Sequence, residues 1–231
     1  MTIFIPGCKW KYKKNFLYID LTISVIILFH ECCIQRIRRD TDNNMSMIQF
    51  HDLLTERLIL RKFKEFDAET FFNYRTNPQV ALYQGEGWTN FKYAQAVEFV
   101  KEQMNLEPGI PDSWFQIAIE LKETGSLIGD CAIHTLPQDT NQVEIGFTLS
   151  PLYQNKGFGT EAVKCLLGYI FDVLNKHRVI AVTDVRNRNS IKLLEKIGLR
   201  REGHFIKNSW YKGEYTDEYL FALLNEEWHN T

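Results

Sequence analysis

Residues 154–160, QNKGFGT, combine three features that bind phosphate groups. Gly157 and Gly159 lack a Cβ, so their backbone N–H groups can approach an anion closely. Thr160 begins a stretch with helical apolar spacing, and the amino end of a helix carries a partial positive charge. Lys156 adds a cation beside the glycines. The stretch therefore predicts a phosphate-binding turn between a strand and a helix.

One carboxylate precedes this loop in the run QVEIGFTLS, residues 142–150. The run alternates in polarity and predicts a strand whose apolar face carries Val143, Ile145, Phe147 and Leu149. Glu144 lies on the opposite face beside Gly146, which leaves room for a ligand. A carboxylate in such a place can accept a proton as a general base. Glu144 is therefore the candidate base, and a solvated strand glutamate is the alternative.

The loop also allows a second interpretation. GFGTEA, residues 157–162, satisfies the pattern G-x-G-x-x-[GA] of dinucleotide-binding proteins, and Asp184 ends the next strand-like run. That fingerprint belongs to the first, tight turn of a repeated β-α-β sheet. Here hairpin-like strands lie on both sides of the loop, and residues 154–156 lengthen the turn. A dinucleotide-binding protein is therefore kept only as an alternative.

Apolar spacing along the rest of the chain predicts the element order β α α β β β α β α β β. Helices are expected at 65–77, 91–104, from the glycine loop to residue 173, and at 189–199. Strands are expected at 57–63, in two runs around KETGS within 114–136, at 142–150, at 177–185, and in two runs around the late KGE. This order indicates an α+β domain over residues 47–231.

Residues 1–46 differ in kind from the rest. A basic segment, KWKYKK, precedes a 14-residue apolar run at 16–29 that contains Asp20. A membrane-spanning helix needs roughly 20 apolar residues, so no membrane anchor is expected. Met45 and Met47 stand just before the regular pattern begins. We interpret residues 1–46 as an extension that is either a non-native start or disordered.

The bulk composition narrows the class of protein. The chain has 231 residues, of which 45% are hydrophobic and 24% charged, as in a globular protein. The net charge of −2 argues against nucleic acid as a partner. The five cysteines are odd in number and show no metal-ligand spacing, which indicates reduced thiols, a cytoplasmic location and no metal.

Three linked segments carry a family resemblance. The loop fits Q-x-x-G-x-G, NRNSIKLLEKIGL follows at 187–199, and TERLILRKF stands upstream at 55–63. Together they resemble the GNAT N-acetyltransferase superfamily, in its RimJ/RimL-like (ribosomal-protein N-terminal acetyltransferase) branch. The resemblance implies a mixed central sheet of about six to seven strands flanked by about four helices. It also implies acetyl-CoA as co-substrate and a primary amine as acceptor, either a protein or peptide N-terminus or a small amine.

The resemblance assigns roles to individual residues. It implies that acetyl-CoA is bound by Phe147, Thr148, Leu149, Gln154, Asn155, Lys156, Gly157, Phe158, Gly159, Thr160 and Asn187. Glu144 is the implied base. Many members place a tyrosine acid where this chain has Leu194, so Ser190 is the remaining hydroxyl near the leaving thiolate. For Asn187 the alternative role is turn formation, and for Ser190 it is bonding at a helix start.

The acceptor groove is expected to be lined by Trp88, Trp210 and Tyr211, with ordinary packing as the alternative. Cys131 and Cys165 fall on apolar faces and are expected in the core. The sequence is compatible with a monomer or a homodimer. An alternative of another class is a GNAT-fold module that binds acyl-CoA without turnover, because the tyrosine acid is missing.

Overall fold

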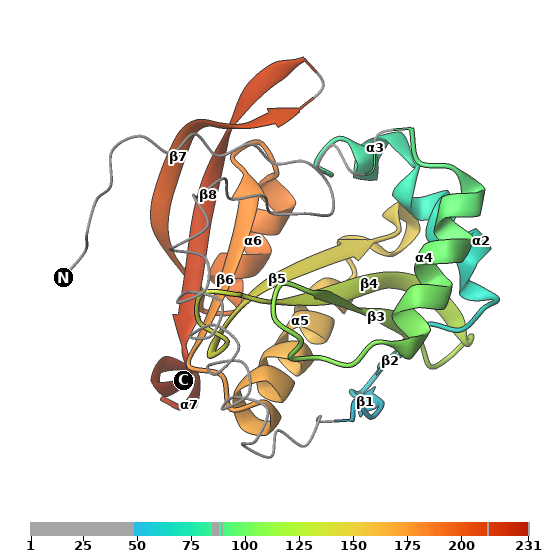
Figure 1. Ribbon diagram of the computed structural model, residues 1–231, viewed down its shortest axis with the longest axis horizontal. Coiled ribbons are helices and arrows are strands. Elements are labelled where there is room, and N and C mark those ends of the chain that lie inside the picture. The colour runs from blue at the N-terminus through green and yellow to red at the C-terminus, as the bar shows by residue number, and fades with distance from the viewer. Residues whose placement is uncertain (1–48, 85–87, 89, 212, 231) are drawn as a thin grey trace, which may run out of the picture. The chain divides into compact units, whose positions relative to one another are not determined.

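The computed structural model describes residues 49–84, 88, 90–211 and 213–230. The predictions for residues 1–46 lie outside this part of the chain. The described residues form a mixed α+β structure, as predicted (Figure 1). Within them, no helix is both long enough and apolar enough to cross a membrane.

Eight strands form one sheet in the order β1-β2-β3-β4-β5-β6-β8-β7. Every neighbouring pair is antiparallel except β5 and β6, which are parallel. This arrangement excludes the repeated parallel sheet of a dinucleotide-binding fold. The strands are β1 (Leu53–Leu54), β2 (Leu58–Arg61), β3 (Trp114–Leu121), β4 (Ser126–Thr135), β5 (Gln142–Leu149), β6 (Arg178–Asp184), β7 (Arg200–Tyr211) and β8 (Glu214–Leu224).

The described helices number six where about four were expected. They are α2 (Asp67–Arg75), α3 (Pro78–Ala81), α4 (Tyr93–Asn105), α5 (Phe158–Gly168), α6 (Arg188–Lys196) and α7 (Asn225–His229). The elements that sequence reasoning missed, β1, α3 and α7, have only two to five residues. Segments of this length contain less than two turns of a helix or less than two pleats of a strand. They are too short to show a periodic pattern of apolar residues.

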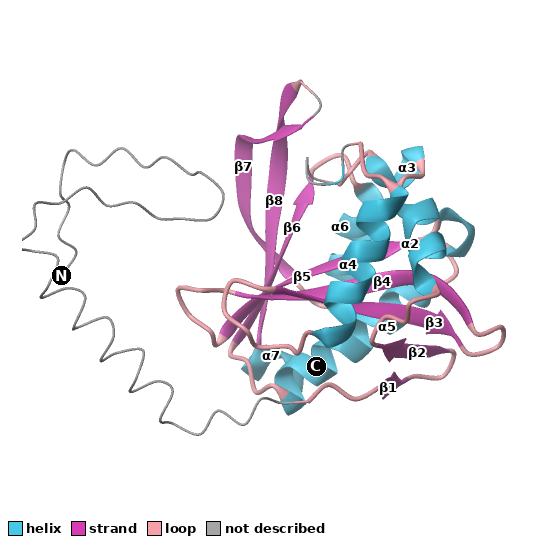
Figure 2. Ribbon diagram, turned by 45° about the vertical axis from the view of Figure 1, so that its right-hand side comes forward, coloured by secondary structure: helices cyan, strands magenta, loops and turns pink. Residues whose placement is uncertain are grey.

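Helices cover both faces of the sheet (Figure 2). The buried apolar residues form two hydrophobic clusters, and alternating residues of β3 belong to different ones. Ile117 and Ile119 lie in the cluster that contains α5, whereas Ala118 lies in the cluster that contains α2 and α4. Burying a leucine or isoleucine side chain fully contributes about 1.5–3 kcal/mol, so these two clusters supply the main stabilisation. Cys131 is buried in the α5 cluster and Cys165 packs half-buried against it, which confirms their core placement.

The helix after the glycine loop departs from its predicted pattern near its end. Ala162, Val163, Leu166, Leu167 and Ile170 are fully buried as expected, but Val173 is 54% exposed. The cause is a π-helical turn, η3 (Tyr169–Val173), which widens the helix by one residue per turn. Phe171 and Leu174 consequently fill the core in place of Val173.

The parallel pairing of β5 and β6 is short. Only Gln142–Glu144 pair with Arg178–Ile180, after which the two strands separate (Figure 1). β5 stays paired with β4 as far as Leu149, and β6 stays paired with β8 as far as Asp184. Among the described residues, no strand pairs with residues 145–149 on the β6 side. The sheet therefore opens as a V next to Glu144.

A buried carboxylate ties α2 to one arm of this V. Asp130 of β4 has no exposed surface and accepts a hydrogen bond of 2.6 Å from the Tyr74 hydroxyl. It also accepts hydrogen bonds from the guanidinium of Arg75 and the amide of Gln116. Burial, together with the charge of Asp130, raises the pKa of Tyr74 well above its usual value, so this tyrosine remains a donor.

We expect Asp130→Asn to lower the free energy of unfolding by about 3–5 kcal/mol, because it leaves the buried Arg75 without its counter-charge. Urea denaturation of both proteins measures the difference. Lys101→Gln is the control, since it breaks an exposed ion pair with Glu65 and should change stability by less than about 0.5 kcal/mol. Similar losses for the two variants would contradict a structural role for the buried pair.

Candidate active site

Two cavities meet in the V between β5 and β6. The first, which we call the strand cavity, has a volume of about 480 Å³ and reaches from Glu144 on β5 across to Glu218 on β8. The second, the loop cavity, has a volume of about 640 Å³ and lies between the glycine loop and α6. Both are lined by the same central residues, which are Leu82, Tyr83, Gln84, Phe147, Thr148, Asn187 and Ser190.

The glycine loop has the backbone expected of an anion-binding turn. Asn155 and Gly157 have positive φ angles of 59° and 84°, and Gly157 is the N-cap of α5. The amide of Gln154 donates a hydrogen bond of 3.0 Å to the carbonyl of Leu149, which folds the loop back onto β5. A Cβ on Gly159 would stand 2.9 Å from a methyl group of Leu193, so only glycine fits there without rearrangement.

Most residues that the sequence assigned to the loop do line the loop cavity, namely Gln154, Asn155, Gly157, Gly159 and Thr160. Lys156 and Phe158 do not. The Lys156 ammonium lies outside the cavity, 5.5 Å from the ring centroid of Tyr153, and Phe158 is 9% exposed and packs in the core. The side chains of Lys156 and Phe158 therefore do not form part of the wall of the loop cavity.

Two lysines that sequence reasoning missed complete the loop cavity. Lys192 and Lys196 line it from α6, and they are four residues apart, which places them on one side of that helix. No carboxylate lines this cavity among the described residues. The amino end of α5 adds its partial positive charge, so the loop cavity suits an anion.

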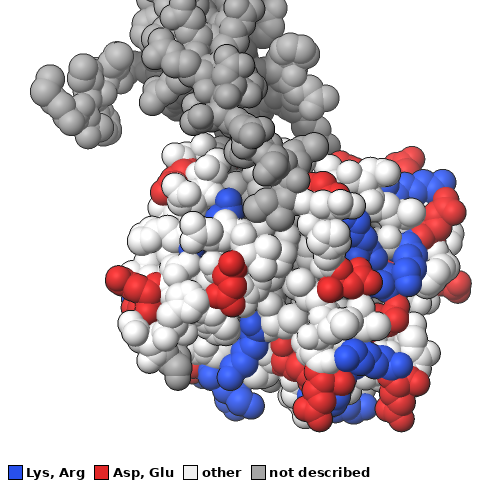
Figure 3. Space-filling model, turned by 90° about the horizontal axis from the view of Figure 1, so that it is seen from below, with Lys and Arg blue, Asp and Glu red and all other residues white. Residues whose placement is uncertain are grey.

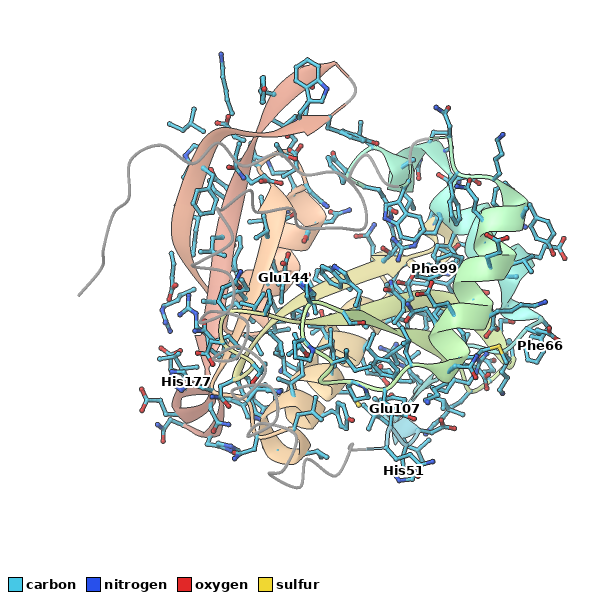
Figure 4. The ribbon with its side chains drawn as sticks, in the orientation of Figure 1. His51, Phe66, Phe99, Glu107, Glu144 and His177 are labelled. Carbon is cyan, nitrogen blue, oxygen red and sulfur yellow. The ribbon has the colours of Figure 1, made fainter. Side chains whose placement is uncertain are left out.

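Glu144 stands where the parallel pairing ends, and its side chain lines the strand cavity (Figure 4). Burial raises the pKa of Glu144; the charge of His134 acts against this rise and that of Glu218 adds to it. Glu144 is therefore a stronger base than an exposed glutamate.

His134 is the neighbour of Glu144 across β4 and β5. Its Nδ1 lies 3.9 Å from a carboxylate oxygen of Glu144, is buried, and has no hydrogen-bond partner among the described residues. Its ring stacks on Trp114 at a centroid distance of 4.8 Å, and Nε2 lies 3.4 Å from Asp112. Sequence reasoning missed His134, because a single sequence does not give the strand register that pairs it with Glu144.

The start of α6 faces the point where the cavities meet. Asn187 is the N-cap of α6, and its Oδ1 accepts a hydrogen bond of 3.2 Å from the backbone N–H of Ser190. The alternative given for Asn187, turn formation, is thus observed, while the side chains of Asn187 and Ser190 also line the two cavities. Leu194 is fully buried and forms part of the wall of the strand cavity.

Of the three aromatic residues expected at the acceptor groove, Trp88 and Tyr211 line the strand cavity. Trp210 lines neither cavity: its side chain is 49% exposed and packs on Tyr215 at a centroid distance of 4.9 Å. Successive residues of a strand point to opposite faces, so Trp210 and Tyr211 cannot both face the cavity.

A short segment of the chain, residues 81–84, crosses the V, and we call it the strap. The Tyr211 hydroxyl donates a hydrogen bond to the carbonyl of Ala81, and the Tyr83 hydroxyl donates one of 3.4 Å to that of Arg186. Gln84 accepts a hydrogen bond of 2.8 Å from Arg75 and donates one of 3.4 Å to the Thr148 hydroxyl. Leu82, Tyr83 and Gln84 of the strap therefore form part of the wall of both cavities.

Comparison with known proteins places the chain in a family. The model of the acetyltransferase (GNAT) domain matches residues 57–200. The uncharacterized N-acetyltransferase YnaD of Bacillus subtilis is 33% identical over 177 residues, which is 77% of this chain and 99% of that protein. A spermidine N(1)-acetyltransferase of Vibrio cholerae is 23% identical over 77% of this chain and 98% of its own length.

A solved structure agrees with this result. The crystal structure of a GNAT-family acetyltransferase from Bacillus anthracis superimposes with a TM-score of 0.68 at 32% identity, covering 77% of this chain and all of that one. Sequence, fold and site thus lead to one family, and this chain belongs to the GNAT acetyltransferases.

Proposed function

We propose that this protein transfers the acetyl group of acetyl-CoA to a primary amine, with CoA in the loop cavity and the amine in the strand cavity. The contrast in charge between the two cavities supports this assignment most strongly. The loop cavity is lined by Lys192 and Lys196 without any described carboxylate, whereas the strand cavity is lined by Glu144 and Glu218, and by Asp184, which is paired with Arg186. Among the described residues that line the strand cavity, the single arginine is Arg75, and it is already paired with Asp130.

The loop cavity fits acetyl-CoA in its polar groups as well as its charge. The glycine turn and the start of α5 offer backbone N–H groups to the diphosphate. The open edge of β5, from Phe147 to Leu149, offers backbone groups to the amides of the pantetheine arm. These positions bring the thioester to Thr148, where the two cavities meet.

The reaction forms an amide bond between the amine nitrogen and the acetyl carbon and releases CoA as a thiol. An α-amino group has a pKa of about 7.7–8.0 and a lysine about 10.4, so the acceptor arrives largely protonated. In our proposal the carboxylate of Glu144 takes this proton before the nitrogen attacks the acetyl carbon. The nitrogen loses a second proton as the C–S bond breaks, and this proton converts the departing thiolate, which accepts a hydrogen bond from the Ser190 hydroxyl, into the thiol. Leu194 has no proton to donate.

The acceptor in this proposal is an extended primary amine, because the strand cavity has a volume of about 480 Å³ and reaches from β5 across to β8. A protein or peptide N-terminus meets this requirement, in keeping with the RimJ/RimL-like segment at 55–63. A small polyamine meets it too. The second carboxylate, Glu218, favours that class, since it would pair with a second ammonium group once Glu144 has deprotonated the first.

An acceptor screen tests this proposal directly. Release of CoA is measured with peptide N-termini, polyamines and aminoglycosides as acceptors, and a thermal shift is measured with acetyl-CoA and with NAD(H). We expect stabilisation by acetyl-CoA alone and turnover of at least one amine class. Stabilisation without turnover of any amine would instead indicate a module that binds acyl-CoA without catalysis.

We expect Glu144→Gln to lower kcat/KM for the amine by about 100-fold, because general-base catalysis contributes about 10²–10⁴. Calorimetry should show unchanged affinity for CoA, since Glu144 does not line the loop cavity. Glu123→Gln, at an exposed turn, is the matched control and should leave both values unchanged. An unaltered rate in Glu144→Gln would exclude this residue as the base.

The pH profile should report on His134. Glu144 accepts a proton only when ionised, so kcat/KM falls as the pH drops through its pKa, and the raised pKa of Glu144 places this decline above that of an ordinary glutamate. The charge of His134 lowers this pKa, so His134→Gln should move the acidic limb to higher pH. His51→Gln, at an exposed position, should not. An acidic limb that stays in place in His134→Gln would show that the two side chains are not coupled.

A further inference from the structure

The segment at 55–61, TERLILR, supplies no residue to either cavity, yet it is tied to the helix that begins at the glycine loop. The Thr55 hydroxyl donates a hydrogen bond of 2.6 Å to Oε1 of Glu161, and the backbone N–H of Arg57 donates one of 2.8 Å to the same oxygen. Nε of Arg57 donates a hydrogen bond of 2.7 Å to Oε2. Both oxygens of Glu161 are therefore held by this segment.

The guanidinium of Arg57 also reaches the loop itself. Nη1 donates a hydrogen bond of 3.2 Å to the carbonyl of Lys156, and the group stacks 4.4 Å from the centroid of the Phe158 ring. Nη2 lies 3.2 Å from the place that a Cβ on Gly157 would take. Arg57 thus contacts Lys156 and Phe158, the residues on either side of Gly157, which adopts a left-handed conformation.

The contact between Arg57 and Glu161 also changes the charge near the loop cavity. Glu161 lies in the first turn of α5, next to the amino end that lines the loop cavity. Burial acts to raise the pKa of Glu161, but hydrogen bonds from Thr55 and Arg57 hold it below its usual value, so the carboxylate is ionised at neutral pH. An uncompensated negative charge there would repel an anion at the same helix end.

We propose that Arg57 and Glu161 form a neutral brace that holds the backbone of residues 154–160 in its anion-binding conformation and keeps the charge of Glu161 from opposing acetyl-CoA. Arg57 is then a positioning residue: it acts on the co-substrate through the loop and through Glu161. The inference rests on the proposed function only in taking acetyl-CoA as the ligand of the loop cavity.

The brace predicts a particular set of kinetic effects. Arg57→Gln should raise KM for acetyl-CoA about five- to tenfold, which is the change in affinity expected from one unpaired charge near a helix end. The values of kcat and of KM for the amine should stay the same. The double variant Arg57→Gln/Glu161→Gln should show a smaller rise than Arg57→Gln, because the bare carboxylate is gone. Arg57→Lys, which keeps the charge but not the forked contacts, should lie between wild type and Arg57→Gln.

Steady-state kinetics and calorimetric titration of CoA into the full chain measure these effects, and circular dichroism verifies folding. Lys62→Gln is the matched control, since it breaks a partly buried ion pair with Glu107 that lines neither cavity and should leave both KM values unchanged. If the wild-type chain does not bind CoA, the proposed function itself fails. If it does, then an unchanged KM for acetyl-CoA in Arg57→Gln, or a double variant as impaired as Arg57→Gln, would overturn the brace.

Discussion

The end of the pairing between β5 and β6 is the constraint on which the site depends. Three residues of each strand pair, and then β5 follows β4 while β6 follows β8. Unpaired backbone groups inside a protein are costly, so a sheet that opens in its middle requires another partner for that edge. Both cavities occupy the opening, and Glu144 is the last residue of β5 to pair with β6. The positions of the proposed base and of the proposed ligand thus follow from one feature of the sheet.

A continuous set of polar contacts joins this opening to the core. Asp130 is fully buried and holds Arg75, Arg75 holds Gln84 of the strap, and Gln84 reaches the Thr148 hydroxyl at the junction of the cavities. A polar group buried without a partner destabilises a protein, so each member of the set keeps the next in place. The strap, although it belongs to no strand of the sheet, is therefore joined through Gln84 to both α2 and β5.

Sequence reasoning succeeded where the signal is local and failed where it depends on register or on distant contacts. The strand before the loop, the glycine turn and the helix end at Gly198, with a φ of 99°, follow from patterns within a few residues. His134 and Glu218 come to Glu144 from other strands, and the partnership of Arg57 with Glu161 spans 104 positions. Such pairs have no local period, and a single sequence does not reveal them. The prediction that Trp210 lines the acceptor groove differs from the structure for another reason. The orientation of Trp210 depends on which face of β7 is turned toward the V, and the sequence does not give that face.

The distribution of charged side chains distinguishes the two cavities of the site. Acidic and basic side chains are interspersed on the face seen in Figure 3, in keeping with the net charge of −2. Inside the V the described residues are largely separated by charge: Glu144, Asp184 and Glu218 line the strand cavity, and Lys192 and Lys196 line the loop cavity. Two ligands of opposite charge would each be attracted to one cavity and repelled by the other, since such fields act before contact is made. Arg75, the described basic side chain in the strand cavity, is paired with Asp130, and Glu161, which lies near the positive end of α5 without lining the loop cavity, is paired with Arg57.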